Sequence, residues 1–448
     1  MIRTVLVANR GEIARRVFRA CRRLNLRAVA VHSEADADAL HVRDADQAVA
    51  IGPAPARESY LDIERIIEAA RRVGADAVHP GYGFLSENWR FAEACRRAGL
   101  VFVGPSADAI RTMGDKTEAR RLMARAGVPV VPGSPETVVD VGEAEMVAGD
   151  IGYPIILKAA AGGGGIGMAR VTTARELRGA FATAARRAQA AFGRGDLYVE
   201  RFLERPRHVE VQVFGDAAGT LLHLGERECS LQRRHQKLVE ESPAPHLPPA
   251  TRQGLVAAAL AGARAIGYVN AGTFEFLLDE GGAFYFLEMN TRLQVEHAVT
   301  EEVTGLDLVV EQLRVAAGER LAWRQVDVVP CRAAIECRVY AEDPARGFLP
   351  SPGTIERLEL PSGEGIRVES GVETGSVVSV HYDPLLFKLV AAGATRAEAV
   401  GRLAAALERC VVEGVHTTLP LLRRVLASPE LHEGRVHTQM IEQGAFNA

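Results

Sequence analysis

The sequence predicts a multidomain protein that combines an α/β part with α+β parts. At 448 residues the chain is too long for a single hydrophobic core, so two or three packed domains are expected. Its first part alternates short apolar runs with amphipathic stretches, which is the pattern of βαβ units. Later parts contain alternating strands, turns and a final helical run. The content of 48% hydrophobic and 25% charged residues is typical of a folded α/β enzyme.

The N-terminal region, residues 1–113, predicts a doubly wound parallel sheet with helices on both faces. We expect the strands at TVLVA, LRAVAVH, ADAVHP and LVFVG. A helix after the first strand places Ile13, Val17, Cys21 and Leu24 on one face, and a second helix covers SYLDIERIIEAARRVG. The first turn, NRGE, lacks the GxGxxG fingerprint, so a nicotinamide-dependent dehydrogenase is disfavoured.

Two further regions follow. A helix that ends in Gly-Val-Pro within residues 114–133 marks the first boundary, and the second region extends from 114 to 325. It contains a glycine-rich loop, strands such as HVEVQVFG and an alanine-rich helix over 174–192. The third region, 331–445, has short strands, turns and a helical run ending near LLRRVL, which predicts a mixed α+β domain.

Composition and charge exclude several classes of function. The net charge of −4 gives no reason to expect nucleic acid or an anionic membrane as a partner. No apolar run reaches the roughly 18–20 residues of a membrane span, and the N-terminus enters a strand pattern at once, so a cytoplasmic protein is expected. The six cysteines show no CxxC spacing and are expected to be reduced and mostly buried.

Lysine is rare in this chain. Of 53 basic side chains only four are lysine, so the other 49 are arginine. An ammonium is a compact charge with rotatable donors, whereas a guanidinium is a wide planar fork. The retained lysines are therefore candidates for sites where arginine cannot substitute, although any one of them could have survived by chance. They are Lys116, Lys158, Lys237 and Lys388.

The glycine-rich loop is a candidate phosphate site. A strand carrying Lys158 leads into Gly162–Gly165 and Gly167. Glycines permit positive φ angles and expose backbone N–H groups to phosphate. The loop is not a Walker A motif, because no Gly-Lys-Ser/Thr follows. A surface turn is the alternative, and the lysine just upstream favours phosphate.

Two strands around the turn at 280–282 predict a β-hairpin that places Glu275 opposite Glu288. Because side chains alternate along a strand, Glu288 and Asn290 share a face, and Arg292, Gln294 and Glu296 follow on it if the chain stays extended. A polar face toward solvent is the common alternative. Two carboxylates and an amide among apolar neighbours indicate a hard divalent ion, Mg²⁺ or Mn²⁺.

A basic cluster, RRHQK, precedes two glutamates at 240–241. A solvated charged loop is the usual reading of such a run. The retained Lys237 favours an anion site instead.

At these residues the sequence resembles the biotin carboxylases of the ATP-grasp superfamily. The motifs occur in family order over essentially the whole chain, and NTRLQVEH is the most specific. They are VANRGEIA, HPGYGFLSEN, GDK, GGGGIGM, RHVEVQV, ERECSLQRRHQK, TFEFL, FLEMNTRLQVEH, VTE, AIECRVYAED, FLPSPG and HYDPLLFKL. The resemblance implies an ATP-grasp domain at 114–325 with a mobile lid over about 132–203. It also implies that ATP phosphorylates bicarbonate to carboxyphosphate, which delivers CO₂ to biotin.

The resemblance also implies a role for each matching residue. Glu275, Glu288 and Asn290 match the metal positions, and both glutamates belong to the ATP site. The bicarbonate positions are Lys237, Arg292, Gln294 and Val295. Glu296 resembles the base that deprotonates bicarbonate, and Arg338 the residue that stabilises the biotin enolate; these two, with Lys237 and Arg292, are the implied catalytic residues. The remaining ATP positions are Lys116, Lys158, Gly164, Gly165, Glu200, Arg201, Phe202, Leu203, His208 and His235.

Ile166 departs from the family, because many members carry Arg or Lys there, and this puts a cationic lid contact in doubt. None of the four lysines is flanked by methionines, so biotin is expected on a separate biotin carboxyl carrier protein. Carboxyltransferase subunits and a homodimer are implied as well, with acetyl-CoA as the default final acceptor. The alternatives are another ATP-grasp ligase, such as one similar to carbamoyl-phosphate synthetase, and an inactive regulatory subunit.

Overall fold

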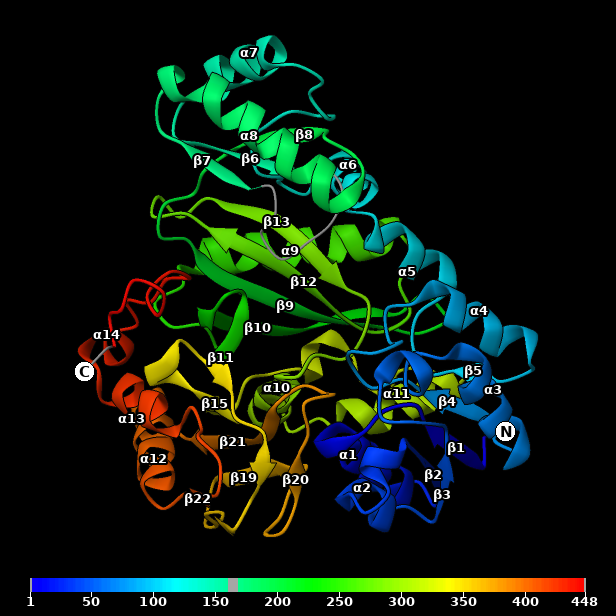
Figure 1. The fold of residues 1–448 in the computed structure, drawn as a ribbon. Helices are drawn as coiled ribbons and strands as arrows, with labels where there is room; N and C mark the ends of the chain where they lie inside the picture. Colours follow the sequence, from blue (N-terminus) through cyan, green and yellow to red (C-terminus); the bar gives the residue numbers. More distant parts are fainter. Residues whose placement is uncertain (1, 160–167, 447–448) are drawn as a thin grey trace.

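The computed structural model describes residues 2–159 and 168–446 (Figure 1). Its N-terminal part is a five-stranded parallel sheet in the order β3-β2-β1-β4-β5, which confirms the doubly wound prediction. The short strand β3 was not predicted. The elements are β1 (Thr4–Val7), α1 (Gly11–Arg23), β2 (Arg27–His32), α2 (Leu40–Asp44), β3 (Gln47–Ala50), α3 (Ile63–Arg72), β4 (Ala77–His79), α4 (Trp89–Arg97) and β5 (Val101–Phe102).

Side-chain caps begin the next helices. Ser106 caps α5 (Ala107–Gly114), and the Asp115 carboxylate accepts from the backbone N–H groups of Thr117 and Glu118 at the start of α6 (Lys116–Arg125). Such caps satisfy N–H groups that have no partner within the helix. The helix expected within residues 114–133 is α6, which begins after the cap at Asp115, and Lys116 lies in its first turn.

A small unit stands apart from the rest of the molecule at the top of Figure 1. It has its own three-stranded sheet, in the order β7-β6-β8, and its own buried core against two helices. Its α8 has the bounds predicted from the sequence. Gly162–Gly165, Ile166 and Gly167 lie outside the described residues. The elements are α7 (Val141–Ile151), β6 (Ile155–Ala159), β7 (Ala169–Val171), α8 (Ala174–Phe192) and β8 (Leu197–Arg201).

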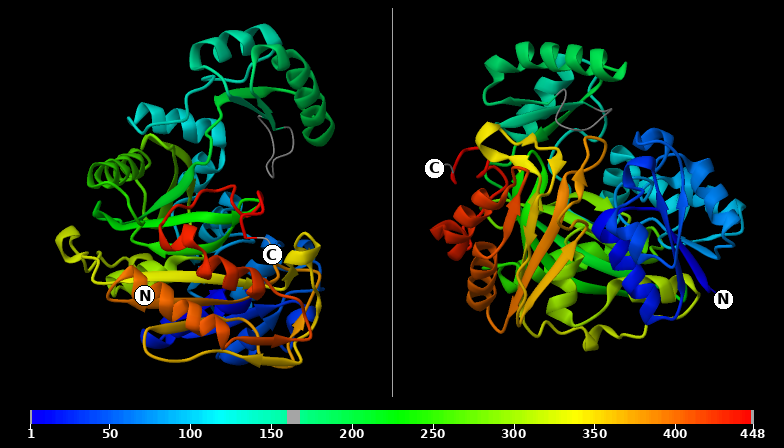
Figure 2. Two further views of the ribbon diagram at one scale, coloured as in Figure 1. Left: turned by 90° about the vertical axis from the view of Figure 1, so that its left-hand side faces the viewer. Right: turned by 60° about the horizontal axis from the view of Figure 1, so that its bottom comes forward.

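An eight-stranded sheet forms the centre of the molecule, in the order β13-β12-β9-β10-β11-β14-β21-β19 (Figures 1 and 2). It includes the predicted hairpin, and it continues from β11 into β14, so strands of the second and third regions share one sheet. Its strands are β9 (Arg207–Gly215), β10 (Leu221–Arg233), β11 (Gln236–Ser242), β12 (Asn270–Leu278), β13 (Phe284–Asn290), β14 (Ala333–Tyr340), β19 (Ile366–Ser370) and β21 (Leu385–Gly393).

Helices cover this sheet, and short ladders complete the C-terminal part. Among the described residues no helix is both long and apolar enough to cross a membrane. The remaining helices are α9 (Pro249–Ala265), α10 (His297–Thr304), α11 (Leu308–Ala316), α12 (Arg396–Glu408), α13 (Leu419–Ala427) and α14 (Pro429–His432). The short strands are β15 (Glu342–Asp343), β16 (Leu349–Pro350), β17 (Gly353–Thr354), β18 (Arg357–Glu359), β20 (Val377–Val378) and β22 (Val411–Glu413).

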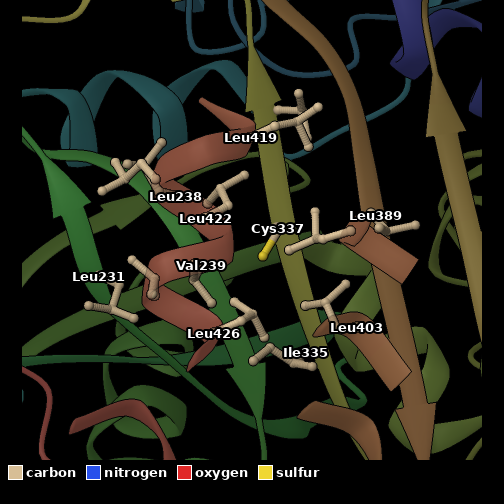
Figure 3. Packing of buried hydrophobic residues seen from close by; sticks show 14 of the residues in the cluster. Leu231, Leu238, Val239, Ile335, Cys337, Leu389, Leu403, Leu419, Leu422 and Leu426 are labelled. Carbon is tan, nitrogen blue, oxygen red and sulfur yellow. The ribbon is translucent and has the colours of Figure 1, made fainter. Parts of the chain in front are cut away.

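A shared core fixes the junction between the two halves of the central sheet. Leu231 and Leu238 of β10 and β11 pack with Cys337 of β14 and with Leu403 and Leu422 of the C-terminal helices (Figure 3). Complete burial of each leucine contributes about 1.5–3 kcal/mol. This core holds β11, β14 and β21 together as one surface. All six cysteines are free, and all but Cys331 are buried.

Candidate active site

One cavity of about 1200 Å³ lies between the small unit, the central sheet, and the N- and C-terminal parts. Every site residue predicted from the sequence that the structure describes lines this cavity. Gly164 and Gly165 lie outside the described residues. The lining residues are Lys116, Lys158, Glu200, Arg201, Phe202, Leu203, His208, His235, Lys237, Glu275, Glu288, Asn290, Arg292, Gln294, Val295, Glu296 and Arg338.

The β12–β13 hairpin brings two acids together. Glu275 and Glu288 are direct cross-strand partners, as predicted. Glu275 is buried, with His208 Nε2 3.0 Å from its Oε2, whereas the Glu288 side chain is 40% exposed and lies 3.8 Å from Lys116 Nζ. Partial burial and repulsion from Glu275 raise the pKa of Glu288 above its ordinary value. A cation between the two carboxylates would relieve this repulsion, so the donor set fits Mg²⁺ or Mn²⁺.

The chain does not stay extended after β13. The strand ends at Asn290, and Glu296 already has the backbone of a helix N-cap, with φ −80° and ψ 12°. The condition for alternation through residue 296, an extended chain, is therefore not met. The side chains converge nevertheless, because the loop returns Gln294 Nε2 to within 2.9 Å of Glu275 Oε1.

Arg292 joins this loop to the N-terminal part. Its guanidinium donates to Asn290 Oδ1 at 2.7 Å, to Gln294 Oε1 at 2.7 Å and to Glu87 Oε2 at 2.9 Å. Asn290 Nδ2 in turn donates to Glu275 Oε1 at 2.8 Å. The amides and the guanidinium thus form one continuous hydrogen-bonded wall beside the two acids.

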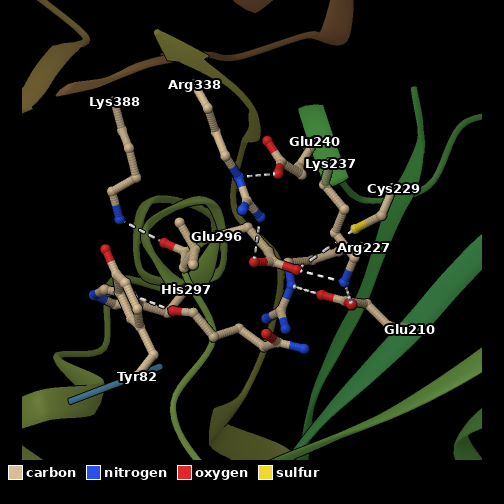
Figure 4. Close-up of polar contacts among 12 residues, drawn as sticks. Tyr82, Glu210, Arg227, Cys229, Lys237, Glu240, Glu296, His297, Arg338 and Lys388 are labelled. Carbon is tan, nitrogen blue, oxygen red and sulfur yellow. Dashed lines mark hydrogen bonds and ion pairs between the residues drawn. The ribbon is translucent and has the colours of Figure 1, made fainter. Parts of the chain in front are cut away.

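Lys237 is the centre of a buried charge cluster (Figure 4). Its Nζ lies 2.5 Å from Glu210 Oε2, and 2.7 Å from both Glu275 Oε1 and Glu296 Oε1. Burial opposes the charge of the ammonium, but these three acids raise the pKa of Lys237 well above its ordinary value. Arg227, which is fully buried, contacts Glu210 Oε1 at 2.5 Å, so Glu210 forms ion pairs with both Arg227 and Lys237.

Glu296 accepts from two cations on different strands. Lys237 approaches Oε1, and Arg338 Nη2 donates to Oε2 at 2.7 Å. Burial alone would raise its pKa, yet Lys237, Arg338 and Arg227 hold the pKa of Glu296 well below its ordinary value. Arg338 Nε also lies 2.5 Å from Glu240 Oε1. Burial, opposed by Arg338, raises the pKa of Glu240 to about 7.

The cavity wall next to the small unit carries other predicted ATP residues. Glu200 of β8 pairs with both Lys158 of β6 and Arg120 of α6, and so connects the small unit to the central part. Lys116 is largely exposed to the cavity, with 74% of its side chain accessible. Lys116, Lys158 and Arg120 therefore bring positive charge to this wall, which suits a polyphosphate.

Sequence reasoning assigned no role to several residues of the site. Glu210, Arg227 and Glu240 carry the buried charges that hold Lys237, Glu296 and Arg338. One signal was available for Glu210. His208, Glu210 and Gln212 alternate along β9 between apolar residues, so three polar side chains share one face of a central strand.

Comparison with known proteins agrees with this geometry. Family models match residues 1–110 as the N-terminal domain of biotin carboxylase, 115–324 as the ATP-binding domain of the carbamoyl-phosphate synthase L chain, and 336–443 as the C-terminal domain of biotin carboxylase. Biotin carboxylase 2 of Bacillus subtilis is 52% identical over 443 residues, covering 99% of this chain and 100% of that protein. This chain belongs to the biotin carboxylase family.

Two further relatives widen the comparison. A pyruvate carboxylase subunit of Methanothermobacter thermautotrophicus is 49% identical, covering 99% of this chain and 90% of that one. A crystal structure shows the biotin carboxylase domain dimer of Hydrogenobacter thermophilus 2-oxoglutarate carboxylase in complex with MgADP, ADP and bicarbonate. It matches this chain with a TM-score of 0.93 and 47% sequence identity, and the match covers 100% of this chain and 99% of that one. Biotin carboxylases thus serve carboxylases with different final acceptors.

Proposed function

We propose that this biotin carboxylase uses ATP, with Mg²⁺ or Mn²⁺, to activate bicarbonate and carboxylate biotin held by a separate carrier protein. The observation that carries the proposal is the pair of acids, Glu275 and Glu288, beside a buried basic cluster in one cavity. Membership of the family and the MgADP and bicarbonate bound by the Hydrogenobacter relative support it.

ATP enters at the end of the cavity lined by Lys116, Lys158 and Glu200 in this proposal. His208, His235 and the segment Arg201, Phe202 and Leu203 line the nucleotide pocket, and Gly164 and Gly165 cover the phosphates. Glu275, Glu288 and Asn290 hold the divalent ion, which neutralises charge on the transferring phosphoryl group. Lys116 and Lys158 orient the phosphates toward the bicarbonate.

Bicarbonate binds against Lys237, Arg292, Gln294 and Val295. The positive charges of Lys237 and Arg292 favour loss of its proton, and Glu296 accepts that proton. An anion beside Glu296 also raises the pKa of this carboxylate, because like charges disfavour the ionised form. Bicarbonate also attracts Lys237, which weakens the ion pair between Lys237 and Glu296. Both effects raise the pKa of Glu296 from its low value in the ion-paired cluster, so Glu296 can accept the proton.

The bicarbonate oxygen then attacks the γ-phosphorus of ATP, and ADP leaves. The product, carboxyphosphate, breaks down to CO₂ and phosphate. The released phosphate accepts the N1′ proton of biotin, and that nitrogen attacks CO₂ while Arg338 stabilises the negative charge on the ureido oxygen. Glu240 and Glu296 hold the Arg338 guanidinium in place for this role.

The partners follow from the same proposal. Biotin is presented by a biotin carboxyl carrier protein, and carboxyltransferase subunits pass the carboxyl group to the final acceptor. A homodimer is proposed because the Hydrogenobacter domain was crystallised as a dimer. The relatives include a pyruvate carboxylase and a 2-oxoglutarate carboxylase, so acetyl-CoA as the acceptor stays a prediction.

The test is ATP hydrolysis by the purified chain with and without bicarbonate and free biotin. We expect bicarbonate-dependent hydrolysis that free biotin stimulates. Hydrolysis that depends on bicarbonate but is not stimulated by biotin would favour a ligase related to carbamoyl-phosphate synthetase, whose ATP-binding domain matches residues 115–324. An inactive regulatory protein would hydrolyse no ATP under any of these conditions.

A further inference from the structure

Lys388 is the one retained lysine without a role in the proposed reaction. It lies in β21 and is fully buried. Its Nζ donates to the backbone carbonyl of Val295 at 2.5 Å and lies 3.1 Å from Glu12 Oε1 in α1. Glu12 also accepts a hydrogen bond from the Tyr82 hydroxyl. Lys388 thus connects the C-terminal part, the N-terminal part and the loop that carries the bicarbonate residues.

The position of Lys388 mirrors that of Arg338. The two residues are direct cross-strand partners on β21 and β14, so their side chains project from the same face of the sheet. Figure 4 shows both side chains extending toward the Glu296 segment. Arg338 contacts the carboxylate of Glu296, and Lys388 contacts the carbonyl of the preceding residue, Val295.

These two contacts fix consecutive parts of one short segment. A peptide group is planar, so a hydrogen bond to the Val295 carbonyl also sets the direction of the Glu296 N–H and of the chain that follows. Glu296 is the N-cap residue of α10, where the backbone changes direction. The orientation of its carboxylate therefore depends on an anchor at Val295.

The chemistry of this buried slot explains why lysine is kept in a chain that otherwise uses arginine. An ammonium has three donors, and here it meets one carbonyl and one carboxylate. A guanidinium has five donors in a planar fork and needs more acceptors and more width. Because Lys388 is fully buried, donors left without acceptors would cost free energy.

We propose that Lys388 is a positioning residue for bicarbonate activation, because its hydrogen bond to the Val295 carbonyl fixes the peptide that joins the bicarbonate site to Glu296. This inference rests on the proposed function. Lys388 is not among the residues that line the cavity, and it reaches the cavity through Val295 and Glu12, which are. Its removal should therefore impair the use of bicarbonate and leave ATP binding intact.

The test compares steady-state ATP hydrolysis by the full chain and by Lys388→Met, with bicarbonate and ATP varied separately. We expect kcat/KM for bicarbonate to fall about 10- to 100-fold, as small misplacements of reacting groups do. KM for ATP should stay within about twofold of wild type. The double variant Lys388→Met/Glu12→Gln also removes the carboxylate that faces Lys388 most closely, so it provides the same readout if the single variant does not fold.

Arg396→Met is the matched control. Arg396 also bridges a buried acid, Glu241, and backbone carbonyls, those of Leu431 and His432, but it is not among the residues of the cavity. Its loss should lower thermal stability and leave kcat/KM for bicarbonate unchanged. If the Lys388 variants lose stability but keep kcat/KM for bicarbonate within about threefold of wild type, the positioning role is wrong. A wild-type chain that shows no bicarbonate-dependent hydrolysis would instead overturn the proposed function.

Discussion

Replacing Lys237 by methionine removes the cation that three buried carboxylates share. Glu210, Glu275 and Glu296 each lie within 2.7 Å of its ammonium, and all three acids are almost completely buried. Arg227, Arg338 and His208 would remain as partial partners. Activity should be lost, and the free energy of unfolding should also fall.

The size of the stability loss follows from the unpaired charge. Breaking a buried ion pair by removing one partner costs about 3–5 kcal/mol, and we expect that loss for Lys237→Met at pH 8. Without the lysine, the pKa values of the three acids rise, so the folded variant binds protons that the folded wild type does not. The difference between the two proteins should therefore shrink as the pH falls, by about 1.4 kcal/mol per pH unit for each extra proton bound.

The assay is urea denaturation at pH 8 and pH 5.5, followed by circular dichroism. Lys116→Met is the control, because Lys116 lines the same cavity but is exposed, so its loss should cost less than about 0.5 kcal/mol. A Lys237→Met variant within about 1 kcal/mol of wild type at pH 8 would refute the reasoning. A stability difference that grows at lower pH would refute it as well.

Three further predictions concern other parts of the molecule. Burial raises the pKa of Glu336 to about 8, above the unfolded value of about 4.5, so this acid destabilises the fold as the pH rises. In urea denaturation, Glu336→Gln should therefore raise the free energy of unfolding by about 1–3 kcal/mol at pH 8.5 and by less at pH 6. A Cβ at Gly262 of α9 would lie 2.6 Å from Met123 Sδ and from Phe274 Cε1, so Gly262→Ala should lower the free energy of unfolding by about 1–3 kcal/mol. Gly149 of α7 has open space around it, so Gly149→Ala should raise the free energy of unfolding by up to about 1 kcal/mol. Equal effects of the two substitutions would contradict this packing. Glu288→Ala should abolish ATP hydrolysis, and unchanged hydrolysis would disprove the metal assignment.

Features set by local patterns could be predicted from the sequence. The period-two alternation around the turn at 280–282 gave both the hairpin and the pairing of Glu275 with Glu288. The βαβ pattern gave the parallel sheet, although the four-residue strand β3 was missed because QAVA is too short to show a period. The cap at Asp115 was also readable in principle, since Asp is a preferred N-cap residue.

Features set by distant contacts could not be predicted from one sequence. The sheet continues from β11 to β14 through pairs such as Glu240 with Glu336, which are far apart along the chain. The pairing of β11 with β14 places Arg338 beside Glu240, and the pairing of β14 with β21 places Lys388 opposite Arg338 and within reach of Val295. The chain is not extended through Glu296, because β13 ends at Asn290 and α10 begins at His297. Tertiary contacts rather than strand periodicity therefore direct Arg292 and Gln294 into the site.

The central claim is that the two acids and the basic cluster act together to carboxylate biotin. The most direct measurement supplies the purified chain with ATP, Mg²⁺, ¹⁴C-labelled bicarbonate and biotin, and determines the label bound to biotin. We predict acid-labile label on biotin that requires ATP, accompanies release of ADP and phosphate, and is lost in Glu296→Gln. ATP hydrolysis without any label on biotin would contradict the account.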